Sequence, residues 1–304
     1  MKKISFIVPV YNNEKTIEKT LNSILNQNNK DIDFEIVVIN DGSTDNSKNI
    51  IEKYKSNENI RIFNKENEGI ATTRNFGVDH AEGEYIIFVD GDDYVEKSLL
   101  DDINDYIEKD VDLIKWSPIW VNTEGEKIKE ADKNEIFECS GEQGFNYLFC
   151  RDVLMSAVWN YAIKKNIMER FPENKLHEDF AVMSLIILKA KTMAITGKVE
   201  YYYVQTGKSI MRGNEHEKQL KRCKDMIDIY DNYHKKLKEL KIEKVTKENL
   251  MIFVTNSLLV TINDLDNENK KYFIKELKQR KIYKNIMPRN LKQIIKRFVL
   301  MIKY

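Results

Sequence analysis

Three carboxylates occupy four positions directly after an apolar run, at Asp90, Asp92 and Asp93. The run, residues 85–89, has the pattern of a strand buried on both faces. Open α/β sheets bind ligands beyond the carboxyl ends of their strands, which is where these acids are expected to lie. Carboxylates this close repel one another unless a cation such as Mg²⁺ or Mn²⁺ neutralises them. The alternative is that Asp92 or Asp93 caps the following helix, and these residues alone leave both interpretations open.

A second acid, Asp41, follows another apolar run at residues 36–40. In a parallel sheet both strand ends open onto one crevice, so the sequence predicts a polar, acid-lined pocket. A nucleotide diphosphate suits such a pocket, because its anionic oxygens can be bridged to a carboxylate through a metal. The other common motifs do not fit. A calcium loop from Asp41 would need glycine at Asn46, no G-x-G-x-x-G follows a strand, and no P-loop is present.

The elements that position these acids alternate between strands and helices. Apolar patterns predict strands at residues 4–8, 35–39, 60–63 and 85–89, with helices at 16–27, 47–54 and 70–80 between them. This order requires right-handed crossovers and a mostly parallel sheet. Further strands are expected at 112–116 and 120–129 and a helix at 142–149, whereas residues from 215 onward are almost wholly helical. We therefore predict a main α/β domain, 1–213, and a helical carboxyl-terminal region, 214–304.

Composition indicates an ordinary soluble protein. The 304 residues are 42% apolar, and their net charge is zero. The charge is unevenly spread, because residues 280–304 contain eight Lys or Arg and no acids, which leaves 49 acids against 41 bases in the remainder. No secretory signal or membrane span is expected. The three cysteines lack metal-ligand spacing, and together these features predict a cytoplasmic location.

Four segments carry a resemblance to a known family. Residues 8–12, 38–45, 67–75 and 88–93 resemble, in order and near the usual spacing, the motifs of family 2 glycosyltransferases. Weaker similarity to bacterial members continues through residues 158–164, 177–180 and 201–212 and then fades. The resemblance implies a GT-A fold and an inverting hexosyltransferase that takes its sugar from a nucleotide diphosphate donor.

The resemblance assigns the nucleotide site residue by residue. Tyr11 and Asp41 are expected to hold the base, while Asn67 and Arg74 line the same end of the pocket. Arg74 could instead be an ordinary salt-bridge partner on a helix surface.

The acids after residue 89 match the family's DxD pair. The resemblance places Asp90 near the ribose and Asp92 on the Mn²⁺ or Mg²⁺ that bridges the diphosphate. Asp93 is then expected to support these residues or to cap the following helix. A cation there would stabilise the charge that develops on the leaving group.

A base must take the proton of the acceptor hydroxyl, and family position indicates Asp179. Glu178 is expected to contact the acceptor or the donor sugar, and His177 is a weaker candidate. Acids in the first turn of a helix are also favoured by its dipole, so helix capping is the alternative for both.

Two further features complete the predicted site. The segment 207–213 matches a loop that often closes over the donor, so Ser209 and Arg212 are expected to reach the diphosphate; a plain basic surface loop is the alternative. Trp159 is expected in the core or in the acceptor wall.

The basic tail forms a predicted helix after Pro288, with an apolar stripe and cations around it. This pattern suits a helix lying on an anionic membrane surface, and docking onto the acidic body is the alternative. No nucleic-acid partner is expected, because no basic face is identifiable in the body.

The resulting prediction is a metal-dependent inverting glycosyltransferase with a helical appendage. Its donor is expected to be a UDP-sugar, and its acceptor a glycan or a lipid-linked molecule of cell-surface polysaccharide synthesis. A nucleotidyltransferase acting on a nucleoside triphosphate and a non-catalytic nucleotide-sugar binding protein are the alternatives.

Overall fold

The computed structural model describes residues 3–28, 32–131, 136–153, 156–205, 216–262 and 265–286. Its contacts divide the chain into two compact units. The first contains Met1–Asn174 and Glu178–Gly207, and the second contains Lys175–His177 and Lys208–Tyr304. The predicted boundary at residue 213 falls outside the described residues and stays a prediction.

In the residues that the structure describes, the first unit contains the ten strands of one sheet together with six α-helices. In chain order they are β1 (Ile4–Val10), α1 (Ile17–Leu25), β2 (Phe34–Asp41), α2 (Ser47–Glu52), β3 (Ile60–Lys65), α3 (Ile70–His80), β4 (Tyr85–Phe88), β5 (Tyr94–Val95), α4 (Leu99–Glu108), β6 (Leu113–Val121), β7 (Lys127–Glu130), β8 (Phe137–Cys139), α5 (Gly141–Cys150), β9 (Tyr161–Lys164), α6 (Glu178–Lys189) and β10 (Met193–Val204). Single 3₁₀ turns, Val158–Asn160 and Lys165–Ile167, flank β9.

The strand order is β3-β2-β1-β4-β9-β6-β10-β5, with β7 beside β6 and β8 beside β10. Strands β1, β2, β3 and β4 pair in parallel, as do β6 and β10, whereas β9 is antiparallel to both β4 and β6. Six strands, β1, β2, β3, β4, β6 and β10, therefore run in one direction, which confirms the predicted mostly parallel sheet. Their carboxyl ends lie at the same edge.

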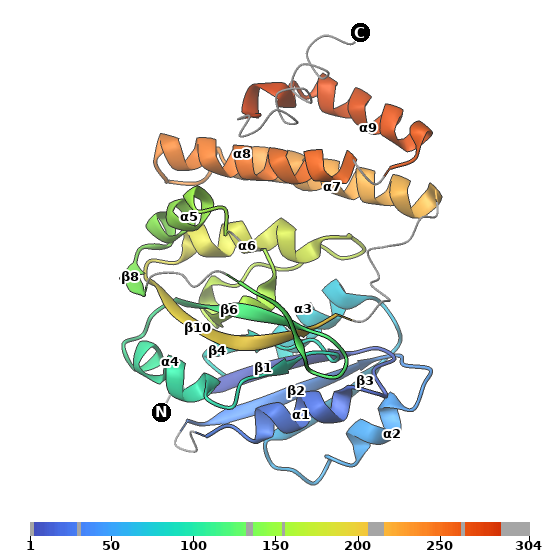
Figure 1. The fold of residues 1–304 in the computed structure, drawn as a ribbon, viewed down its shortest axis with the longest axis vertical. Coiled ribbons are helices and arrows are strands. Elements are labelled where there is room, and N and C mark those ends of the chain that lie inside the picture. The colour runs from blue at the N-terminus through green and yellow to red at the C-terminus, as the bar shows by residue number, and fades with distance from the viewer. Residues whose placement is uncertain are drawn as a thin grey trace. The chain divides into compact units, whose positions relative to one another are not determined.

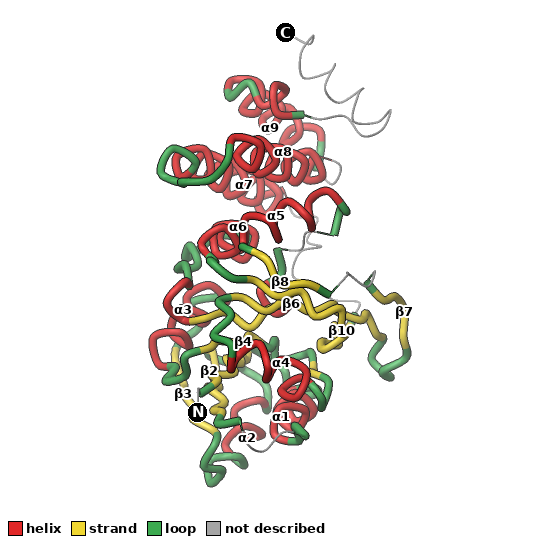
Figure 2. The backbone as a smooth tube through the Cα atoms, turned by 90° about the vertical axis from the view of Figure 1, so that its left-hand side faces the viewer, coloured by secondary structure: helices red, strands yellow, loops and turns green. Residues whose placement is uncertain are grey.

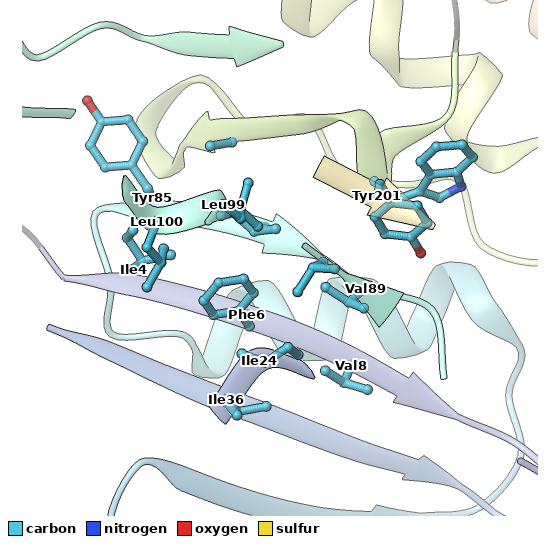
Figure 3. Close-up of a cluster of buried hydrophobic side chains, with 14 of the residues drawn as sticks. Ile4, Phe6, Val8, Ile24, Ile36, Tyr85, Val89, Leu99, Leu100 and Tyr201 are labelled. Carbon is cyan, nitrogen blue, oxygen red and sulfur yellow. The ribbon is translucent and has the colours of Figure 1, made fainter. Parts of the chain in front are cut away.

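Helices cover both faces of this sheet (Figures 1 and 2). On one face, Ile24 of α1 and Leu99 of α4 pack with Phe6 of β1, and Figure 3 shows this cluster. On the other face α3 contacts β1 so closely that a Cβ on Gly77 would lie 2.4 Å from Ile7 Cγ2. Strands enclosed in this way are apolar at most positions, which explains why β4 reads as an unbroken apolar run and β1 as one interrupted only by Ser5, whose hydroxyl donates to Glu35.

The second unit is helical, as predicted, with α7 (His216–Lys236), α8 (Lys244–Thr261), α9 (Asn267–Gln279) and a 3₁₀ turn, Ile282–Asn285. The predicted apolar stripe of α7 is buried at Cys223, Ile227, Tyr230 and Tyr233. None of the helices in the described part of the chain is both long enough and apolar enough to cross a membrane. The basic helix predicted after Pro288 lies outside the described residues, so its membrane role stays a prediction.

Candidate active site

The loops that follow β1 and β2 are joined by side-chain hydrogen bonds. Asn12 Oδ1 accepts from Thr44 N at 2.8 Å, and Asn12 N donates to Ser43 Oγ at 3.1 Å. Asn13 N donates to Ser47 Oγ at 2.8 Å. These polar residues, typical of turns, therefore connect the loop after β1 to the loop after β2.

Asp41 is buried at the end of β2 and organises the loop before α3. Its Oδ1 accepts from Lys65 Nζ at 2.5 Å and from Glu68 N at 3.0 Å, and its Oδ2 accepts from Gly69 N at 3.0 Å. Burial alone would raise the pKa of Asp41, but these donors outweigh it and hold the pKa below its ordinary value. Lys65 escaped the sequence analysis, because its pairing depends on the register that sets it opposite Asp41.

The predicted nucleotide-base residues surround this loop. Gly42 has φ +67°, and a Cβ there would lie 2.7 Å from Asn67 N, so only glycine lets the two loops meet. Asn67 is exposed beside the Asp41 loop, and Tyr11, at the end of β1, is 47% exposed. The structure thus gathers Tyr11, Asp41 and Asn67 at neighbouring strand ends, while their contact with a base stays a prediction.

Arg74 of α3 joins the two acidic motifs. Its Nη2 donates to Asp90 Oδ1 at 2.8 Å and its Nη1 to Glu178 Oε1 at 2.5 Å. The residue is only 4% exposed, and its guanidinium lies among the rings of Phe88 and Phe171. Burial by itself would lower the pKa of Arg74, but the charges of Asp90 and Glu178 outweigh it and raise the pKa above its ordinary value, so the guanidinium remains charged. Arg74 is therefore a salt-bridge partner, as the alternative held, but it is buried and not on a surface, and the predicted contact with a nucleotide stays open.

The turn containing Asp90 and Asp92 is held by α1 and by Thr16, the residue that precedes it. Thr16 Oγ1 donates to Gly91 O at 2.8 Å, and Thr20 Oγ1 donates to Asp93 O at 2.7 Å. Burial and the nearby Asp90 raise the pKa of Asp92 to about 6, and no described cation pairs with it. One carboxylate of the turn is thus neutralised by arginine and the other is not.

This donor set fits a divalent cation that arrives with its ligand. Mg²⁺ is usually held by one or two carboxylates together with substrate phosphates. The described residues contain no cluster of three or more metal-binding side chains. Asp92 and the free oxygen of Asp90 would supply two ligands, and a cation would relieve the repulsion between them.

The role predicted for Asp93 as a helix cap is wrong. Asp93 is buried and accepts from Tyr201 Oη at 2.8 Å and from Val204 N at 2.7 Å, which ties the turn to β10. Tyr201 Oη also accepts from Asp90 N at 3.1 Å. The short strand β5 separates the turn from α4, whose N-cap is Ser98. A two-residue strand leaves no periodicity, so the sequence could not reveal it.

Asp179 lies in the first turn of α6, beside Glu178. Burial and the charge of Glu178 raise its pKa to about 7, with Arg74 opposing them, and its Oδ1 accepts from Phe180 N at 2.7 Å. A carboxyl with this pKa suits a general base near neutral pH. Because α6 begins at Glu178, the helix dipole favours both acids as well, and the catalytic role stays a prediction.

The remaining predicted residues are His177, Trp159, Ser209 and Arg212. Burial and Arg222 lower the pKa of His177 to about 4, so its imidazole is neutral at physiological pH. Trp159 is buried and stacks on Tyr201, with ring centroids 4.4 Å apart, which assigns it to packing. Ser209 and Arg212 lie outside the described residues, so the closing loop stays a prediction.

Comparisons with known proteins agree with this geometry. The model of "Glycosyl transferase family 2" matches residues 5–186. The chain is 33% identical over 210 residues to "Poly(ribitol-phosphate) beta-N-acetylglucosaminyltransferase TarS" of Staphylococcus aureus, covering 67% of this chain and 35% of TarS. It is 29% identical over 207 residues to TarP of the same species, covering 67% of this chain and 63% of TarP. The chain therefore spans about a third of TarS and under two thirds of TarP.

A solved structure shares the fold. The crystal structure of residues 1–349 of Staphylococcus aureus TarS in complex with UDP-GlcNAc has a TM-score of 0.76. The match covers 94% of this chain and 84% of that one, at 23% sequence identity.

Proposed function

This chain belongs to glycosyl transferase family 2, with a GT-A fold, and from that premise we propose that it moves a sugar from a UDP-sugar to an acceptor hydroxyl with inversion. The complex of TarS with UDP-GlcNAc supports a uridine diphosphate donor and makes UDP-GlcNAc the first to test. The names of TarS and TarP support an acceptor that is a phosphate-bearing glycan or polymer, lipid-linked or free.

The observation that carries this proposal is the double ion pair of Arg74. One guanidinium binds both Asp90, just after β4, and Glu178, at the start of α6. Glu178 is 104 positions away from Arg74 in the sequence. Asp179 follows Glu178 directly, so the same arginine sets the donor-side acid and the base in a fixed relation. Single displacement needs that relation, because base and leaving group act on opposite sides of one carbon.

On the donor side, the loops after β1, β2 and β3 would bind the base, and the turn after β4 would bind the cation. Tyr11 and Asn67 lie exposed around the buried Asp41, where a base would rest against the ordered loop. Asp92, with the free oxygen of Asp90, would hold Mn²⁺ or Mg²⁺. When bound, that cation would neutralise the diphosphate as it leaves.

On the acceptor side, Asp179 takes the hydroxyl proton as the new bond forms. Glu178 is committed to Arg74 through its Oε1. Its charge, together with burial, raises the pKa of Asp179 to about 7, which makes Asp179 a stronger base than an exposed aspartate. Glu178 is therefore a positioning residue in this proposal.

The test is release of UDP from a panel of UDP-sugars by the full chain, with Mn²⁺ and after chelation. We expect UDP release from one sugar above the others and a fall on chelation. Release of pyrophosphate from nucleoside triphosphates, with no UDP release from any UDP-sugar, would overturn the proposal in favour of a nucleotidyltransferase.

A further inference from the structure

The outer face of α1 and the segment around β5 form a second hollow, separate from the strand ends. It has a volume of about 530 Å³ and is lined by nine residues, of which three are lysines: Lys15, Lys19 and Lys97. We call it the α1 groove. We infer that the α1 groove binds a polyol-phosphate chain, namely the acceptor polymer beyond the unit that reacts. The inference rests on the proposed function.

The lysines of the α1 groove are available to a ligand. Among the described residues, no carboxylate forms an ion pair with Lys15, Lys19 or Lys97, although Glu18 also lines the groove. Other lysines of the first unit are paired, as Lys65 is with Asp41 at 2.5 Å. Three unpaired cations against one acid give the groove a positive charge on a body that is otherwise acidic.

Helical spacing puts polar groups in one line along the groove. Lys19 and Asn22 lie on the solvent side of α1, and the exposed Lys15 and Asn26, just before and just after the helix, continue the line at intervals of four residues. The opposite side, with Leu21 and its neighbours, is buried in the core. The two ammonium groups at one end of this line can bind the phosphates of a polyol-phosphate chain, and the two amides at the other end can bind its hydroxyls.

The aromatic residue of the groove argues against a nucleic acid. Lys19 Nζ lies 3.5 Å above the centroid of the Tyr94 ring, and Tyr202 stacks on the ring with centroids 4.5 Å apart and planes 8° apart. A cation and another ring thus occupy its two neighbouring faces, so no base can stack there, whereas single-stranded nucleic acids are held largely by stacking. The groove also contains none of the exposed large apolar residues that insertion into a lipid surface requires.

The groove leads to the acidic turn. Thr16 and Thr20 alternate with the lysines along α1, and their hydroxyls bind the carbonyl groups of Gly91 and Asp93. Tyr94 follows Asp93 directly. A chain held along α1 would therefore reach the turn that carries Asp90 and Asp92, so the groove can position a long acceptor without taking part in the chemistry.

The experiment compares two variants that remove equal charge from the full chain. Lys15→Gln, Lys19→Gln and Lys97→Gln together empty the groove of cations, while Lys48→Gln, Lys53→Gln and Lys55→Gln remove three exposed lysines on and after α2. The probe is a ribitol-phosphate oligomer, titrated without donor at two salt concentrations. We expect the groove variant to bind about tenfold more weakly and with less salt dependence, and the α2 variant to bind like the wild type.

Donor hydrolysis separates this inference from the proposed function. The groove variant should release UDP from UDP-GlcNAc at the wild-type rate, because no groove lysine belongs to the donor site. Equal oligomer binding by wild type and groove variant, or no binding by the wild type, would overturn the inference. So would a loss confined to single-stranded DNA or to anionic vesicles. Absence of UDP release from every UDP-sugar would overturn the proposed function, while the binding measurement would still decide about the groove.

Discussion

Asp179 and Glu200 both have raised pKa values, and their surroundings differ. The pKa of Asp179 rises to about 7 at the start of α6, beside the ion pairs of Arg74. The pKa of Glu200 in β10 rises to about 9, where burial and the hydrogen bond with Asp102 favour its protonated form. Around Asp179 the strand ends supply acids and loops for a ligand, whereas around Glu200 they do not. A raised pKa marks a functional carboxyl only where the fold also provides a place for substrate.

The largest effect is expected from Asp179→Asn, which removes the base and preserves the shape. Transfer should fall by about 10³-fold, while binding of UDP-sugar stays within about twofold. Transfer rates and calorimetric titration of the donor measure the two. The comparison would fail if Glu200→Gln lowered transfer by as much.

Arg74→Met should cost about 3 kcal/mol of unfolding free energy, because two carboxylates lose their buried partner. Urea unfolding measures the change. Arg170→Met is the matched control, because its ion pair with Asp79 is exposed on both sides and should contribute less than about 1 kcal/mol. Equal losses from the two substitutions would show that the Arg74 bridge is no stronger than a surface pair.

Glu200→Gln should stabilise the protein at alkaline pH, by about 2 kcal/mol at pH 8. The folded protein binds this proton up to pH about 9, whereas the ordinary pKa is 4.5, so the wild type loses stability as pH rises through that window. The amide keeps a donor for Asp102 and has no charge to bury. Thermal unfolding of both proteins between pH 5 and pH 9 should give midpoint temperatures whose difference grows as the pH rises. A constant difference would contradict the raised pKa of Glu200.

The last prediction concerns the pH dependence of transfer. Asp179 must be ionised to act as base, so kcat/KM should rise about tenfold per pH unit below about 7 and then level off. The same raised pKa makes ionisation of Asp179 unfavourable to folding as pH rises from its ordinary value of 3.8 to about 7. Activity and this contribution to stability therefore change in opposite directions. A rate that stays level down to pH 5 would exclude Asp179 as the base.

Sequence reasoning predicted the parts whose signal is local. Apolar runs marked β1, β2 and β4, because strands enclosed on both faces are apolar at most positions, and the acids at the end of β2 and after β4 followed directly. The family resemblance added Arg74, Glu178 and Asp179, and the structure shows them in contact or adjacent.

The rest depended on distant pairing. Lys65 meets Asp41 through strand register, and Arg74 meets Glu178 across 104 positions, which no local pattern encodes. The cap predicted at Asp93 failed because a strand of two residues, β5, has no detectable period. The α1 groove was missed for a related reason: Lys97 joins Lys15 and Lys19 only once β5 packs against α1.

The hydrogen bond from Val204 N to Asp93 has a mechanical consequence. Val204 is the last residue of β10, and the chain leaves the first unit at Gly207. The same carboxylate therefore fastens both the acidic turn and the point of exit. Tyr201, also in β10, contacts the same turn, because its Oη donates to Asp93 and accepts from Asp90 N. A displacement of the end of β10 would therefore reach the acidic turn through two side chains. Asp93→Ala would remove the hydrogen bonds that Asp93 accepts and weaken this coupling.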